Sequence, residues 1–201
     1  MKDTVIIGAG PAGLTAFLYS TMYGLEVVCI GDMIGGKVIS APKIIDYPGI
    51  TEISGKEFID RLHTQLLRSH LEITVGKVTE LKRRDGQPHH FEVTHTLGTV
   101  ETKTVLLATG NPNKQARNKA SVLGEMCEVE NRNKQYLVDL RMMTNIAGIF
   151  AAGDAVVYPV SFEQLATSVA SGIKAAGGVY HYLTGKNPPI LWGNTHIQRF
   201  I

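Results

Sequence analysis

Short apolar runs separated by a helical pattern open the chain. Residues 4–7 and 27–30 are apolar and rich in β-branched side chains, and a glycine follows each run. Buried parallel strands have this pattern. Between them, residues 14–20 carry apolar side chains on successive helical turns, and Gly24 ends the segment. Residues 1–30 therefore predict a β-α-β unit.

A second helix and a group of strands follow a long irregular connection. Ser54 is a suitable N-cap with Glu57 three residues later, and apolar residues at helical spacing continue from there. From 72 to 107 the period becomes strand-like, with turns at 85–86 and 97–98. This part predicts a small antiparallel meander that leads into a buried strand at 105–108.

The C-terminal part of the sequence predicts two strands and a helix. We expect strands at 136–139 and 149–152, and a final helix over 162–183 with close packing at Ala166, Ala170, Ala175 and Ala176. The whole chain, 1–201, predicts one α/β domain, a Rossmann-like doubly wound parallel sheet with a β-meander crossover in three layers.

Composition excludes several classes of protein. With 44% apolar and 19% charged residues, the chain is expected to be globular. The net charge is only +2 and the basic residues are scattered, so we expect no nucleic-acid partner. Neither a membrane span nor a targeting segment is expected, and the seven histidines show no metal-ligand grouping. Cys29 and Cys127 are too far apart for a CxxC pair, which predicts reduced thiols and a cytoplasmic location.

The glycine motif at the end of the first strand indicates a dinucleotide site. Gly8, Gly10 and Gly13 form GxGxxG where a strand passes into a helix. They permit a tight turn, close approach of a pyrophosphate and close helix packing, while the helix N-terminus attracts phosphate. The motif alone leaves NAD and FAD open. The usual ribose-binding carboxylate is missing at Ile30 and Gly31, and only Asp32 is near.

Five glycine-containing blocks stand out along the chain, and they are 8–13 (GAGPAG), 35–36 (GG), 47–49 (YPG), 108–110 (ATG) and 148–154 (GIFAAGD). Together they resemble the FAD domain of the low-molecular-weight thioredoxin reductases, and they occur in that family's order over most of 1–110 and 134–185. The resemblance implies FAD as the cofactor. The cofactor-binding residues it implies are Gly8, Gly10, Pro11, Ala12, Gly13, Asp32, Gly35, Gly36, Lys37, Asp46, Ala108, Thr109, Gly110, Gly153, Asp154, Gln164, Leu165 and Ala166.

The resemblance also assigns roles within that set. The motif glycines would hold the pyrophosphate, and Gly36, Lys37 and Asp46 would border the flavin. Gly153 and Asp154 would lie on the ribitol and phosphate side, with the carboxylate accepting hydrogen bonds from ribityl hydroxyls or water. Residues 164–166 would follow the isoalloxazine.

Departures from the family change the functional expectation. The family inserts an NADPH domain with a CxxC pair before the final strand, whereas here a short replacement occupies 111–133 and the stretch to residue 145 holds one glycine and one cysteine. A nucleotide-binding unit and a redox loop do not fit in this interval. Lys37 and Asp46 stand where the family tends to have Gln and Asn, which changes the charge near the flavin.

The sequence thus predicts a flavoprotein whose electron donor or acceptor is a separate partner. With no CxxC pair, it names no catalytic residue. A non-catalytic FAD-binding module, or a degenerate remnant of a reductase, is the alternative, and a deletion from a longer enzyme stays open. We also expect a homodimer, and we expect the C-terminal tail 187–201, with Trp192, His196 and Phe200, to cover a flavin.

Overall fold

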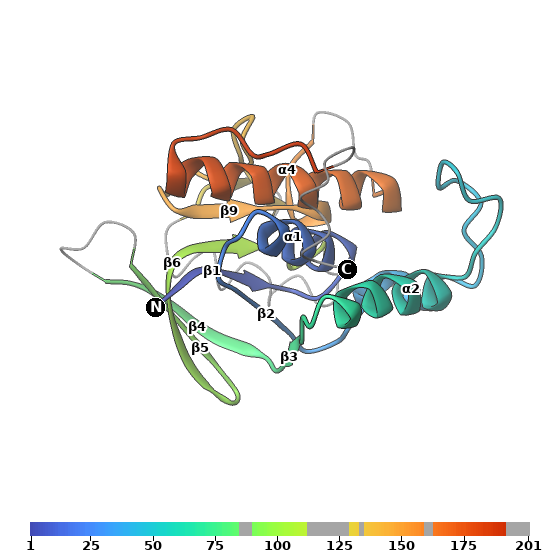
Figure 1. The fold of residues 1–201 in the computed structure, drawn as a ribbon, viewed down its shortest axis with the longest axis horizontal. Coiled ribbons are helices and arrows are strands. Elements are labelled where there is room, and N and C mark those ends of the chain that lie inside the picture. Colours follow the sequence, from blue (N-terminus) through green and yellow to red (C-terminus); the bar gives the residue numbers. More distant parts are fainter. Residues whose placement is uncertain (85–89, 112–128, 133–134, 159–162, 192–201) are drawn as a thin grey trace.

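The computed structural model describes residues 1–84, 90–111, 129–132, 135–158 and 163–191 (Figure 1). Its main sheet consists of β1 (Lys2–Ile7), β2 (Val27–Gly31), β3 (Thr74–Val75), β4 (Val78–Arg83), β5 (Phe91–His95), β6 (Gly98–Leu107) and β9 (Ile149–Ala151). The helices are α1 (Pro11–Met22), α2 (Gly55–Arg68) and α4 (Leu165–Thr184), with 3-10 turns η1 (Gly36–Ser40) and η2 (Gly153–Ala155). A short ribbon pairs β7 (Asn131–Arg132) with β8 (Gln135–Tyr136).

Strand β6 joins the parallel and antiparallel parts of the sheet. Its first half pairs antiparallel with β5, which pairs with β4, and its second half lies parallel between β1 and β9. The predicted β-α-β unit and meander are confirmed, and the fold is α/β. The last strand of the expected meander and the separate buried strand expected at 105–108 are one ten-residue strand, β6. The hydroxyl of Thr104 donates to the Asp3 carbonyl at 2.8 Å, which satisfies a polar side chain inside this strand.

Three further expectations about elements need correction. Strand β3 pairs in parallel with β2 at the sheet edge and is not part of the meander, because its partner is set by the chain's return from α2. The strand expected at 136–139 is limited to the two-residue β8, whose Tyr136 is buried. Helix α4 begins at Leu165, since Gln164 has an extended backbone with φ −114° and ψ 144°.

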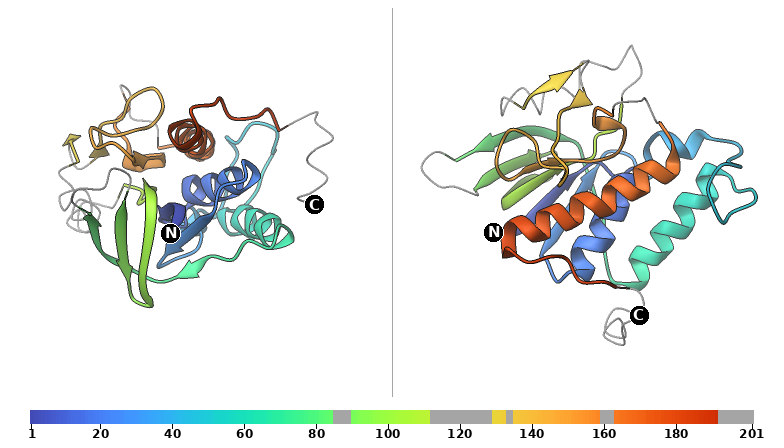
Figure 2. Two further views of the ribbon diagram at one scale, coloured as in Figure 1. Left: turned by 60° about the vertical axis from the view of Figure 1, so that its left-hand side comes forward. Right: turned by 90° about the horizontal axis from the view of Figure 1, so that it is seen from above.

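Helices α1, α2 and α4 lie side by side over one face of the sheet (Figure 2). Close contact between α1 and α4 depends on small residues, and Ala175 and Ala176 are fully buried as expected. Ala170 instead faces solvent and Ala166 is half-buried, so the predicted contact stripe was partly wrong. Ser54 caps α2 as predicted, accepting a 3.1 Å hydrogen bond from the Glu57 N–H.

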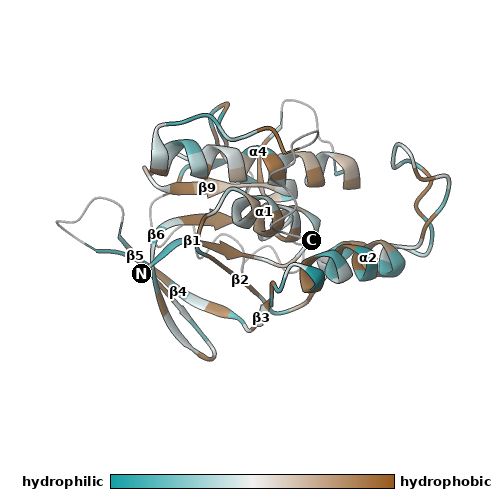
Figure 3. Ribbon diagram, in the orientation of Figure 1, coloured by the Kyte–Doolittle hydropathy of each residue, from teal (hydrophilic) through white to brown (hydrophobic). Residues whose placement is uncertain are grey.

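The core lies between these helices and the strands. Apolar residues occupy the C-terminal ends of β1 and β6 and all of β9 (Figure 3), and Val5, Ile6, Leu106 and Phe150 are at most 1% exposed. Within the described residues, no helix is long and apolar enough to cross a membrane, and no group of side chains suits a metal ion. The predicted turn at 85–86, Cys127, most of the 111–133 replacement and the tail from Trp192 onward lie outside the described residues.

Candidate functional site

A cavity of about 740 Å³ opens at the carboxyl ends of the parallel strands. The register places Ile7 beside Leu107 and Leu107 beside Ala151, so β1, β6 and β9 end at the same level. The loops that follow these strands therefore start together and line the cavity. Ligands of open α/β sheets bind at this position.

The glycine motif shapes one wall of the cavity by two kinds of contact. Gly8 has φ +113°, and an added Cβ would come within 2.3 Å of the Ala108 carbonyl oxygen. A Cβ at Gly13 would lie 1.8 Å from the Gly8 oxygen. Gly10 differs, because none of the described residues other than its chain neighbours has an atom within 4 Å of its Cβ position, although it lines the cavity. Gly8 and Gly13 are thus required by packing, whereas Gly10 leaves open space for a ligand.

The first turn of α1 provides a site for an anion. Its N-cap is Gly10, no side chain caps it, and it carries no acidic residue. Pro11 occupies the start of the helix, and Pro11 and Ala12 line the cavity. The positive end of the helix dipole is therefore available to a phosphate group. Gly35 donates its N–H to the Ala9 carbonyl at 2.7 Å and so fixes the start of η1 against this loop.

Asp154 supplies a partly buried carboxylate to the opposite wall. Ser168 in α4 donates its hydroxyl to Asp154 Oδ1 at 3.1 Å, and the Gly153 N–H donates to Ser171 Oγ at 2.7 Å. Burial raises the pKa of Asp154, and the Ser168 hydrogen bond acts in the opposite direction. The strand end and α4 thus hold a carboxylate that can accept hydrogen bonds from ligand hydroxyls.

An ion pair and an amide cross the cavity rim. Lys37 Nζ lies 2.7 Å from Glu163 Oε2, and Asn111 Nδ2 donates to Glu163 Oε1 at 2.7 Å. The hydrogen bond to Glu163 raises the pKa of Lys37, and the hydrogen bonds from Lys37 and Asn111 lower the pKa of Glu163. The positive charge expected from Lys37 is therefore matched by a carboxylate.

The Thr109 hydroxyl is a buried polar group in the lining of the cavity. It has no hydrogen-bond partner among the described residues. Buried polar groups in proteins are nearly always paired, so this hydroxyl calls for a ligand or water. With the open space at Gly10 and the uncapped α1, the site suits a ligand that is anionic in one part and hydroxyl-rich in another.

Most of the predicted residues meet in this cavity. Those lining it are Gly8, Gly10, Pro11, Ala12, Asp32, Gly36, Lys37, Ala108, Thr109, Gly110, Gly153, Asp154, Gln164 and Leu165. Gly13 and Gly35 do not line the cavity but pack behind its wall. Gly13 packs on Gly8, and a Cβ at Gly35 would meet Ile59 at 3.0 Å. Ala166 does not line the cavity, although Leu165 directly before it does.

Asp46, which was expected to border the flavin, does not line the cavity. It belongs to an exposed loop, 45–51, that projects beyond α2 (Figure 1). A bridge between Ile44 and Ile53 closes the loop, and the rings of Tyr47 and Phe58 pack 5.2 Å apart at its base. The sequence predicts an irregular connection here, but it does not predict the direction in which the loop projects.

Sequence reasoning missed several lining residues. They are Ala9, Met33, Val38, Ser40, Ala41, Asn111, Ala152, Glu163 and Ser168. Most are immediate neighbours of predicted residues. Glu163 precedes Gln164 directly, and the unmatched charge of Lys37 was the signal that could have pointed to it.

Tight packing explains the missing ribose-binding carboxylate. A Cβ at Gly31 would lie 2.6 Å from the Ala9 side chain, so a glutamate or aspartate does not fit there. Asp32, one residue later, is exposed and lines the cavity. Cys29, in the same strand as Gly31, is fully buried, and burial raises the pKa of its thiol to about 12, so the thiol is an unreactive part of the core.

Two solved structures share this fold. A thioredoxin reductase from Gloeobacter violaceus superposes with a TM-score of 0.80 at 18% identity, in a match covering 96% of this chain and 99% of that chain. A ferredoxin-flavin thioredoxin reductase from Clostridium acetobutylicum gives 0.77 at 21% identity, covering 92% and 98%. At these identities the likeness shows the fold alone.

Sequence comparisons identify the family of this chain. A thioredoxin reductase from Ureaplasma parvum is 34% identical over 135 residues, which is 67% of this chain and 41% of the relative. A ferredoxin–NADP reductase from Lacticaseibacillus paracasei is 32% identical over 114 residues, 54% of this chain and 34% of the relative. The chain thus spans less than half the length of these relatives. The pattern of one family matches residues 2–121 and 55–172, and the chain belongs to that family, the pyridine nucleotide-disulphide oxidoreductases.

Proposed function

We propose that this chain is an FAD-binding, thioredoxin reductase-like flavoprotein that exchanges electrons with a separate redox partner. The open space at Gly10, beside the uncapped start of α1, is the observation that carries the proposal. A pyrophosphate needs both close approach to the backbone and a positive helix end. FAD is the dinucleotide we propose because the sequence blocks resemble the FAD domain of thioredoxin reductases, and a thioredoxin reductase is among the relatives.

Different residues of the cavity would bind different parts of FAD. Gly10, Pro11 and Ala12 would hold the pyrophosphate, and the Asp154 carboxylate would accept hydrogen bonds from ribityl hydroxyls. Thr109 would pair its buried hydroxyl, and Gln164 and Leu165 would border the isoalloxazine. When bound, FAD supplies the capacity to take up and release electrons, and the protein supplies binding, orientation and electrostatics.

The short interval after β6 is the reason for a separate partner. Residues 111–145 contain one glycine and no second GxGxxG motif, so the chain offers no site of that kind for a nicotinamide nucleotide there. Relatives include a ferredoxin–NADP reductase, which makes an iron-sulfur protein or a dithiol protein a suitable class of partner. We also propose a homodimer, and sedimentation at tens of micromolar protein tests it.

Photoreduction of the purified protein tests the electron-transfer proposal. We expect yellow protein with one FAD per chain, and fast reoxidation by some acceptors but not others. The alternative, a non-catalytic module in which FAD mainly stabilises the fold, is favoured by the same short interval. A bound flavin that no ferredoxin-like or dithiol acceptor reoxidises would favour the module, and a colourless protein that rejects FAD would contradict both functions.

A further inference from the structure

Glu163 connects three segments that are distant in sequence. Its two carboxylate oxygens each hold one partner, Lys37 at 2.7 Å and Asn111 at 2.7 Å, from positions 126 and 52 residues away. Lys37 belongs to η1 after β2, Asn111 follows the end of β6, and Glu163 immediately precedes the N-cap of α4. All three line the cavity.

Fold stability does not account for this arrangement. The side chains of Lys37 and Glu163 are 58% and 39% exposed, and exposed ion pairs contribute little to the free energy of unfolding. Holding three flexible side chains in one geometry also has an entropic cost. The connection crosses the rim of the cavity between segments that the core already positions, so its effect is expected on the contents of the cavity.

We propose that Glu163 is a positioning residue that latches Lys37 and Asn111 across the cavity rim and slows release of the bound dinucleotide. The inference rests on the proposed FAD binding and adds a residue and a role to it. In the latched arrangement, η1 and the segment after β6 are tied to the start of α4. Release requires these segments to separate, and interactions that must break on release act mainly on the dissociation rate.

The Glu163→Gln variant tests the latch while keeping the size of the side chain. We expect FAD to leave this variant about two to five times faster than wild type, the range that exposed charged contacts can supply. Release is followed as the change in flavin fluorescence after rapid dilution of the yellow protein into buffer without FAD. Thermal unfolding of the FAD-free protein should stay unchanged, which separates positioning from a structural role.

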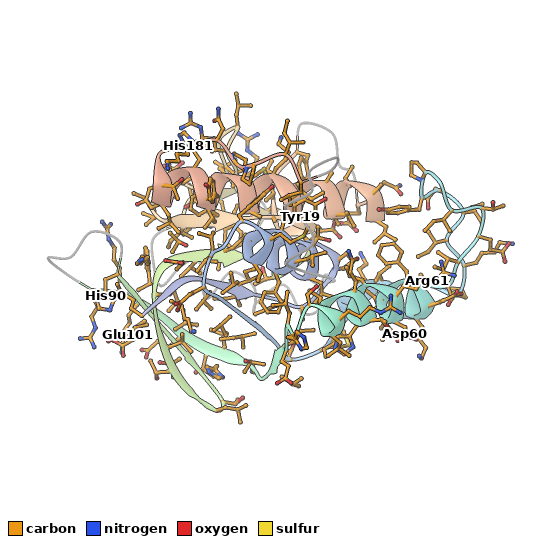
Figure 4. All side chains as sticks on the ribbon, viewed as in Figure 1. Tyr19, Asp60, Arg61, His90, Glu101 and His181 are labelled. Carbon is orange, nitrogen blue, oxygen red and sulfur yellow. The ribbon has the colours of Figure 1, made fainter. Side chains whose placement is uncertain are left out.

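A matched ion pair serves as the control. Lys56 and Asp60 on α2 form an exposed pair of 2.6 Å, and neither residue lines the cavity (Figure 4 labels Asp60). Asp60→Asn should therefore release FAD at the wild-type rate. It removes the same kind of charge from the same kind of pair.

A double-mutant cycle shows whether Lys37 acts through Glu163. If it does, the Lys37→Gln/Glu163→Gln double variant should release FAD no faster than the faster single variant. Unchanged release from Glu163→Gln, additive effects in the cycle, or an equal effect of Asp60→Asn would each overturn the latch. A wild-type protein that rejects FAD would overturn the proposed function as well, so the two failures are distinguishable.

Discussion

Gly172 in α4 packs so tightly on Ala12 in α1 that an added Cβ would lie 2.4 Å from the Ala12 carbonyl oxygen. The Ala12 side chain in turn lies 2.8 Å from the Cβ position of Gly153, in the loop after β9. The first turn of α1, the last helix and the Asp154 loop therefore meet at one residue. This contact joins the two halves of the chain beside the cavity, which Ala12 and Gly153 both line.

Gly172→Ala should destabilise the protein although alanine is the better helix former. Propensity alone favours the change by about 1 kcal/mol, but the overlap with Ala12 forces α4 away from α1. We expect a net loss of about 1–3 kcal/mol in the free energy of unfolding, measured by denaturant titration. Gly177→Ala in the same helix is the matched control, because among the described residues its Cβ would meet only the Pro188 side chain, at 3.3 Å. Equal stability of the two variants would contradict the packing argument.

The regular elements could be predicted because their patterns are local. The runs at 4–7 and 27–30 are bounded by glycines, and Ser54 with Glu57 marks the start of α2, so periodicity and capping were sufficient. Strand β3 could not be placed, because two residues carry no period and only pairing with β2 defines them. The single strand β6 was divided in error because its partners change halfway along it, which local sequence does not encode.

The site was predictable where the backbone itself forms it. Gly8, Gly10 and Gly153 are fixed by tight turns and a close approach, which leave a signal in the sequence. Glu163 was missed because its role depends on Lys37, 126 residues away. Such a pair becomes visible only when the fold brings both residues to the same rim.

Gly10→Ala should separate cofactor binding from folding. Because no described residue other than its chain neighbours has an atom within 4 Å of the Gly10 Cβ position and φ is −80°, the FAD-free variant should unfold within a few degrees of the wild-type temperature, the small loss expected when alanine replaces a glycine N-cap. A methyl group in the pyrophosphate space should weaken FAD binding by about 10- to 100-fold, and Gly10→Glu should abolish it. Gly13→Ala is the contrast, since its Cβ would lie 1.8 Å from the Gly8 oxygen and should damage folding itself. Normal FAD retention in Gly10→Glu would refute the assignment.

Asp154→Asn should stabilise the FAD-free protein and weaken its cofactor binding. Burial raises the folded-state pKa of Asp154, so folding favours the protonated form and the carboxylate costs stability at any pH above the pKa values of both states. Asparagine removes this cost and still accepts the Ser168 hydrogen bond. We expect a higher unfolding temperature at pH 7, with the difference shrinking toward pH 3. FAD affinity should fall, because the amide is a weaker acceptor for ribityl hydroxyls. A variant that lost stability at pH 7 would contradict the sign.

NADPH or NADH alone should reduce the bound flavin slowly or not at all. Hydride transfer depends on holding the nicotinamide against the flavin, and orientation supplies a large part of the rate in such reactions. The only GxGxxG motif in the sequence is the one at Gly8, whose loop we assign to FAD, and residues 111–145 hold a single glycine. Anaerobic stopped-flow mixing measures the rate as bleaching of the flavin absorbance, and chemical reduction with dithionite serves as the control that the flavin is reducible. Saturable bleaching within about a second at micromolar nucleotide would show that the chain has a second nucleotide site and supplies its own donor.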